Sequence, residues 1–96
     1  MTKQGRGALT RRVADKSKEM LGREITLTEL RLMPYIQYEL MNNRRVSVDR
    51  MNGDEISVLN DWLLAGWLTE LSPLKTSKKF YDAMCEILYL AYVDIN

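Results

Sequence analysis

The side chains that most often carry catalysis are scarce in this chain. It has no histidine, which is the usual general base at neutral pH and the commonest metal ligand. A single cysteine cannot build a zinc site, and Cys85 lies in a strongly apolar stretch where a thiol is normally an inert core group. The carboxylates are scattered, and no glycine-rich phosphate loop is present. The sequence therefore predicts a protein that is not an enzyme, with no catalytic residues, no metal site and no cofactor.

Basic residues form the clearest chemical pattern, although the net charge of the whole chain is only +1. Residues 1–23 carry seven basic and two acidic side chains, a net charge of +5, whereas the remainder has a net charge of −4. Such asymmetry can mark a basic arm that contacts duplex DNA, and the alternative is a solvated helix face. The candidate phosphate contacts are Lys3, Arg6, Arg11, Arg12, Arg44, Arg45, Arg50, Lys75, Lys78 and Lys79, and the candidate base readers are Ser57 and Asn60.

Aromatic residues supply a second set of candidates, for a protein interface. Residues 77–93 are expected to form a helix with apolar residues on two sides, so this helix is either central to the core or shared with a partner. Its tyrosines Tyr81, Tyr89 and Tyr92 are candidate interface anchors, because aromatic side chains bury a large area with few rotors. Trp67 is a further candidate, and the alternative is that Trp62 packs in the core and Trp67 lies on the strand that follows.

Length and composition set the framework for these side chains. A chain of 96 residues, 46% hydrophobic and 28% charged, has the composition of one globular domain. We expect a flexible basic arm at residues 1–7 and a single helical domain at residues 8–96. The start lacks a signal-peptide pattern, no run is long enough for a membrane helix, and one cysteine allows no intrachain disulfide. These features favour a soluble, cytoplasmic protein.

Helix signals are strong in the first half of the chain. An amphipathic helix is expected over residues 8–21, ended by Gly22. Thr26 and Glu29 have the spacing of a capping box, which predicts a second helix from there to Met41. In this second helix we expect Leu27 and Met41 on or near the buried side, and a kink or break at Pro34, which cannot donate a backbone hydrogen bond.

The second half alternates between helical and extended patterns. Residues 44–49 are either a short strand or the approach to one helical turn at 49–51, and residues 54–65 form a clear amphipathic helix before Gly66. Residues 67–71 and 74–76 alternate as strands do, and the last helix follows. The sequence predicts a mainly α fold with a small β element. It would be a compact domain of four or five helices, with a two- or three-stranded wing.

The order of these elements resembles a winged helix-turn-helix domain. The resemblance rests on Leu59, Trp62, Leu63, Gly66, Trp67 and Leu68, which look like the end of a recognition helix and its turn into the wing, and on residues 74–80, which look like the second wing strand and the final helix. Winged helices commonly bind DNA through the major groove, so the resemblance implies a DNA-binding accessory or regulatory protein. Three acids on the recognition helix, Asp54, Glu55 and Asp61, would however face phosphates.

A second resemblance concerns origin. Residues 80–94, with Leu59, Asn60, Asp61 and Trp62 before them, are similar to small uncharacterised phage and prophage proteins. The hypothesis favoured by the sequence is a non-enzymatic interaction, scaffold or adaptor protein of phage or prophage origin. It would use its apolar C-terminal helix to bind a protein partner or a second copy of itself, as a homodimer. The alternative is the winged-helix-like DNA-binding protein.

Overall fold

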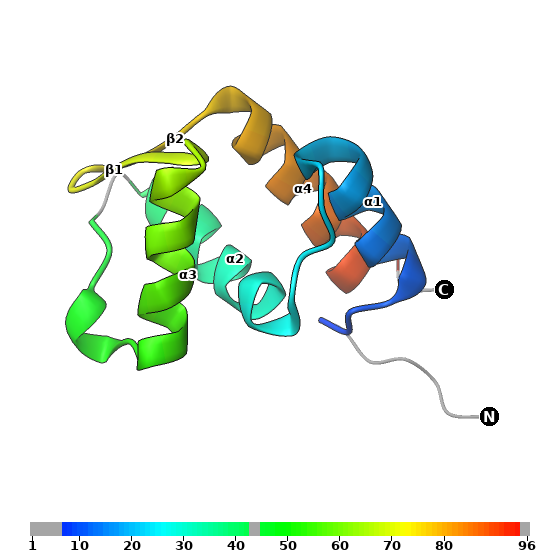
Figure 1. The fold of residues 1–96 in the computed structure, drawn as a ribbon, viewed down its shortest axis with the longest axis horizontal. Coiled ribbons are helices and arrows are strands. Elements are labelled where there is room, and N and C mark those ends of the chain that lie inside the picture. Colours follow the sequence, from blue (N-terminus) through cyan, green and yellow to red (C-terminus); the bar gives the residue numbers. More distant parts are fainter. Residues whose placement is uncertain (1–6, 43–44, 95–96) are drawn as a thin grey trace.

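The computed structural model describes residues 7–42 and 45–94, and within them the fold is mainly helical with a small two-stranded antiparallel sheet, as predicted (Figure 1). The elements are α1 (Arg11–Leu21), α2 (Leu27–Met41), the 3-10 turn η1 (Val48–Arg50), α3 (Gly53–Leu64), β1 (Leu68–Leu71), β2 (Leu74–Thr76) and α4 (Lys78–Tyr92).

Each α-helix begins at a side chain that caps its first turn. The hydroxyl or amide oxygens of Thr10, Thr26, Asn52 and Ser77 accept hydrogen bonds from backbone N–H groups that the helix leaves without partners. In α2 and α3 the glutamate three residues later returns the bond, which completes the capping box predicted at Thr26 and a second box at Asn52. The cap at Thr10 explains why α1 begins at Arg11 and not at Ala8.

Two expectations for α2 need correction. Of the kink or break expected at Pro34, the break is wrong, because the helix is continuous from Leu27 to Met41. The proline removes only one backbone bond, and the buried neighbours Met33 and Ile36 hold the helix against the core. Leu27 is 38% exposed and Met41 is 71% exposed, so neither is a core residue. The core face of α2 is therefore narrower than its apolar sequence indicates.

The described part of the segment between α2 and α3 contains a short turn and no strand. Residues 45–47 are irregular, and Val48–Arg50 form a single 3-10 turn, close to the helical alternative expected at 49–51. The backbone N–H of Val46 donates to the carbonyl of Leu71 at 3.1 Å, which joins this segment to the hairpin. Within the described residues the sheet therefore has two strands, and position 44 lies outside them.

The hairpin follows α3 through Gly66, whose φ of 80° lies in the left-handed region that glycine adopts at low cost. β1 and β2 pair antiparallel, with Leu71 opposite Leu74 and Leu68 opposite Thr76. Leu68 and Leu74 are both buried. The hairpin thus covers one end of the core.

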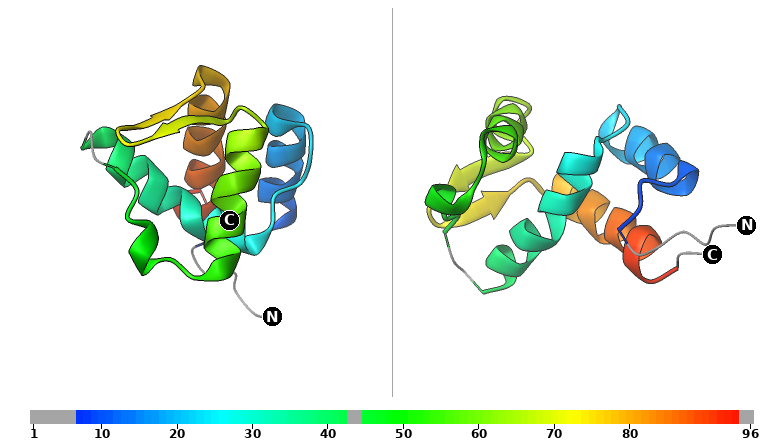
Figure 2. Two further views of the ribbon diagram at one scale, coloured as in Figure 1. Left: turned by 60° about the vertical axis from the view of Figure 1, so that its left-hand side comes forward. Right: turned by 90° about the horizontal axis from the view of Figure 1, so that it is seen from below.

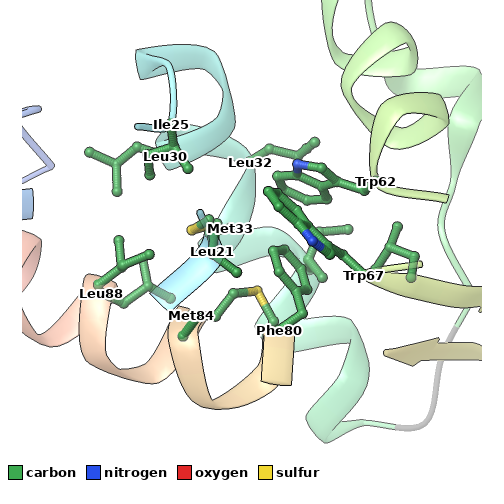
Figure 3. Packing of buried hydrophobic residues seen from close by; sticks show 14 of the residues in the cluster. Leu21, Ile25, Leu30, Leu32, Met33, Trp62, Trp67, Phe80, Met84 and Leu88 are labelled. Carbon is green, nitrogen blue, oxygen red and sulfur yellow. The ribbon is translucent and has the colours of Figure 1, made fainter. Parts of the chain in front are cut away.

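The helices are arranged around α2, which lies between α3 on one side and α4 on the other (Figures 1 and 2). The helix α1 packs along α4. The largest fully buried side chains are Trp62, Phe80, Leu30, Met33 and Ile36. Figure 3 shows Trp62, Trp67 and Phe80 gathered where α3, the hairpin and α4 meet. The two ends of the described chain meet in another part of the fold, beside α1 and α4, where the N–H of Gly7 donates to the carbonyl of Ala91 at 2.8 Å.

Candidate functional site

A buried carboxylate, Glu29, joins three parts of the fold. The guanidinium of Arg23 donates two hydrogen bonds to its two oxygens, at 2.9 and 2.7 Å. The indole N–H of Trp62 on α3 donates at 2.8 Å, and the backbone N–H of Thr26 donates at 2.8 Å. Because Glu29 is only 3% exposed and has four donors, its role is structural: it holds α2, α3 and the α1–α2 loop together.

The charge of Glu29 is maintained by these donors. Burial alone raises the pKa of Glu29. The hydrogen bonds from Arg23, Thr26 and Trp62, with the attraction of the Arg23 charge, outweigh that effect and lower its pKa below the ordinary 4.5. The hydrogen bond between Arg23 and Glu29 raises the pKa of Arg23, although partial burial acts in the opposite direction. Glu29 is thus an ionised, fully occupied group, with no acceptor left for catalysis.

Trp67 is not an interface anchor, contrary to one expectation from the sequence. It is only 9% exposed and stacks on Phe80, with 5.2 Å between the ring centroids and 16° between the planes. The guanidinium of Arg23 lies 5.0 Å from the Trp67 ring centroid, on the outer side of this stack. The core position expected for Trp62 is therefore confirmed, and Trp67 is buried beside it, one residue before β1 begins (Figure 3).

A largely apolar hollow lies between α2 and α4, and we call it the α2–α4 groove. It has a volume of about 370 Å³ and is lined by Pro34, Gln37, Cys85, Leu88, Tyr89, Tyr92 and Val93. Gln37 is its polar member, and its amide contacts the Cys85 sulfur at 3.6 Å. Cys85 is thus half-buried at the groove and is not enclosed in the core. The other lining side chains are largely apolar or aromatic, which suits an apolar partner.

Exposed apolar side chains lie at the α4 side of this groove, where Tyr89 is 54% exposed and Val93 is 67% exposed. Tyr38 and Met41 are also exposed on α2, but they do not line the groove. Of the predicted tyrosines, Tyr89 and Tyr92 line the groove, and Tyr81 is exposed outside it. Sequence reasoning missed the α2 side of the groove. No local pattern in the sequence indicates that Pro34 and Gln37 complete the groove from α2.

Most of the described basic candidates lie beside carboxylates. Arg12 forms an ion pair with Asp94 at 2.8 Å, and Lys78 with Asp82 at 2.7 Å. Arg11 lies 3.6 Å from Asp15, and Lys75 lies 3.5 Å from Glu70. No ion pair within the described residues involves the other three described candidates, which are Arg45, Arg50 and Lys79. The candidates Lys3, Arg6 and Arg44 lie outside the described residues.

These basic residues also come from separate parts of the molecule. Arg11 and Arg12 lie on α1, whereas Lys75 lies on the hairpin at the other side of the fold (Figure 1). The two candidate base readers, Ser57 and Asn60, are exposed on α3. The same helix exposes Asp54 and Asp61, whose negative charges would repel a phosphate backbone.

Comparisons with models of known protein families, with curated proteins and with solved structures gave no match. No helix in the described part of the chain is both long enough and apolar enough to cross a membrane. The described residues also include no group of three or more histidine, cysteine or acidic side chains placed to hold a metal ion. The functional argument therefore rests on the geometry of this chain.

Proposed function

We propose that this protein is a non-enzymatic interaction protein, of phage or prophage origin, which acts in the cytoplasm by docking through the α2–α4 groove. The observation that carries the proposal is the apolar lining of the groove together with the exposed side chains at its α4 side. Such contiguous apolar surface is typical of interaction sites on small proteins. Among the described residues, Glu29 is the one buried carboxylate with hydrogen-bond donors, and its full engagement in the fold agrees with a role outside catalysis.

The first occupant of the groove is a second copy of the chain. A two-fold symmetric interface must place the same patch on both partners, so the patch has to contain both a hollow and a projection that fills it. The groove meets this requirement, because the exposed Tyr89 and Val93 stand at the edge of the hollow floored by Pro34 and Leu88. Tyr89 of one copy would enter the groove of the other. The resulting dimer would act as a scaffold that presents two copies of each surface outside the interface.

The test is the oligomeric state of the whole chain and of two variants. Light scattering coupled to size exclusion should show a dimer for the wild type and a monomer for Tyr89→Arg, because a buried arginine without a partner is costly. Leu64→Arg is the matched control, since Leu64 is an exposed apolar residue on α3, away from the groove, at 87% exposure. It should remain dimeric. A monomeric wild type, or a Tyr89→Arg variant that stays dimeric, would refute the proposal.

DNA binding is the second candidate, supported by the order α2, η1, α3, β1, β2 and by the exposed Ser57 and Asn60 on α3. The ion pairs of Arg12, Lys75 and Lys78 weigh against it, because paired cations neutralise fewer phosphates. A duplex-binding titration at low and moderate salt decides the matter. Binding that weakens steeply with salt and is lost in Arg45→Ala and Lys79→Ala would establish this function, and no binding at low salt would exclude it.

A further inference from the structure

A second hollow lies on another side of α2, between this helix and the segment that leads into α3. Its volume is about 500 Å³. Leu32, Tyr35 and Glu39 line it from α2, and Met51 and Glu55 line it from the other wall. The hydroxyl of Tyr35 accepts a hydrogen bond from the backbone N–H of Ser47 at 3.0 Å, which fixes that wall to the helix. We call this hollow the Glu39 pocket.

Glu39 is the unusual residue in this pocket. It is only 5% exposed, yet no hydrogen bond or ion pair within the described residues involves its carboxylate. Among the described residues, no fully enclosed side-chain oxygen or nitrogen lacks a partner. The Glu39 carboxylate must therefore keep its remaining solvent contact through the pocket that it lines. Its position in the last turn of α2 adds repulsion from the negative end of the helix dipole. Such a placement lowers the stability of the fold, because a buried carboxylate without a hydrogen-bond donor is unfavourable.

The other charged groups in the pocket do not compensate Glu39. Arg31 and Arg50 line its rim, but both are exposed, and neither lies within ion-pair distance of a described carboxylate. Their charges are exposed to solvent and their long side chains can move, whereas the Glu39 side chain is enclosed. Two carboxylates, Glu39 and the more exposed Glu55, therefore line the pocket opposite these two arginines. The ring of Tyr35 adds an electron-rich aromatic face to its wall.

We propose that the Glu39 pocket binds an organic cation, a guanidinium or alkylammonium group, with the Glu39 carboxylate as its acceptor and Tyr35 as its aromatic contact. The cation is either a small free amine or the arginine or lysine side chain of a partner protein, since both present the same chemistry. The pocket does not use the α2–α4 groove, so the inference does not depend on the dimer.

The first test uses two probes of the same shape and different charge. N-acetylarginine amide carries a guanidinium, and N-acetylcitrulline amide replaces it with a neutral urea. Calorimetry or amide-shift titration of the whole protein should give an affinity about tenfold or more in favour of the arginine probe, because a charge-assisted bond to a buried carboxylate is the stronger one. Equal binding of the two probes, or binding of neither, would overturn the proposal. So would acetate binding that competes with the arginine probe, because it would mean an anion site made by Arg31 and Arg50.

The second test assigns the preference to Glu39. Glu39→Gln keeps the shape and removes the charge, and it should abolish the preference for the arginine probe. Glu86→Gln is the matched control, because it removes the same charge from an exposed position on α4, and it should preserve the preference. A Glu39→Gln variant that still prefers arginine would refute the assignment.

Two further arms identify the source of the cation and separate this inference from the dimer. N-Propylguanidine carries the same single guanidinium without a peptide backbone. Binding of N-propylguanidine as tight as that of the arginine probe points to a small free cation, and tighter binding of the arginine probe points to a partner's side chain. The probe titration is repeated with Tyr89→Arg, and retained binding in a monomer supports a pocket that works alone. Loss of binding in Tyr89→Arg would contradict that independence.

Discussion

Glu29 and Glu39 lie on the same helix, are buried to nearly the same extent, and have opposite surroundings. Glu29 is in the first turn of α2, where the helix dipole favours a negative charge, and it accepts hydrogen bonds from Arg23, Thr26 and Trp62. Glu39 is in the last turn, where the dipole opposes it, and it has no such partner among the described residues. Burial alone therefore does not show whether a carboxylate stabilises the fold. The hydrogen-bond donors around it decide that.

The largest effect is expected at the partnered carboxylate. Glu29→Gln removes a charge that Arg23 and Trp62 are arranged to meet, and it replaces an acceptor by an amide that also donates. Since the Arg23 side chain is 46% exposed and can recover solvent, we expect a loss of about 2–4 kcal/mol in the free energy of unfolding, at or below the range for breaking a buried pair. Chemical denaturation at neutral pH measures it. An unchanged free energy of unfolding in Glu29→Gln would show that the Glu29 charge is dispensable and would contradict the comparison.

A smaller effect is expected at the donor on α3. Trp62→Phe retains an aromatic ring against Phe80 but removes the N–H that donates to Glu29. The lost charge-assisted bond and the smaller ring together should cost about 1.5–3 kcal/mol. The double variant with Glu29→Gln sharpens the test, since residues in one network are not additive. Strict additivity of the two losses in the denaturation curves would show that the bond contributes nothing.

Acidification should weaken the same network. The pKa of Glu29 is lower in the folded chain than its ordinary value of 4.5, so the unfolded chain binds the proton more tightly. Its stabilising contribution is therefore fully present above about pH 4.5–5 and is lost as the pH falls through the folded-state pKa. Thermal melts between neutral and acidic pH should show a steeper decline for the wild type than for Glu29→Gln. Parallel declines would place the pH dependence at other carboxylates.

Much of the fold was predictable, because its signals are local. The capping boxes at Thr26 and Asn52, the stop at Gly66 and the strand alternation after it each depend on neighbours within a few residues, and the helices and hairpin follow from them. Of the kink or break expected at Pro34, the break does not occur, because core packing holds the helix together, which is a tertiary effect. The sequence placed Trp67 on the strand after Gly66 and did not predict its burial, since its contacts with Phe80 and Arg23 span distant positions.

The candidate sites were less predictable for the same reason. Tyr89 and Tyr92 were anticipated from the apolar surplus of the last helix, but Pro34 and Gln37 complete their groove from α2, and no local pattern announces that pairing. Glu39 resembles any polar residue in a helix of mixed composition. Its isolation depends on the absence of a donor from the facing segment, which only a three-dimensional arrangement reveals.

The most direct test of the account is the free energy of unfolding of Glu39→Gln, measured by chemical denaturation beside Glu29→Gln under identical conditions. Removing the charge from a buried carboxylate that lacks donors and lies at the negative end of a helix should stabilise the protein by about 0.5–2 kcal/mol. The account thus predicts opposite signs for the two substitutions. A destabilised Glu39→Gln variant would show that the Glu39 charge has a partner within the fold. The Glu39 carboxylate would then not be available to bind a ligand in the pocket.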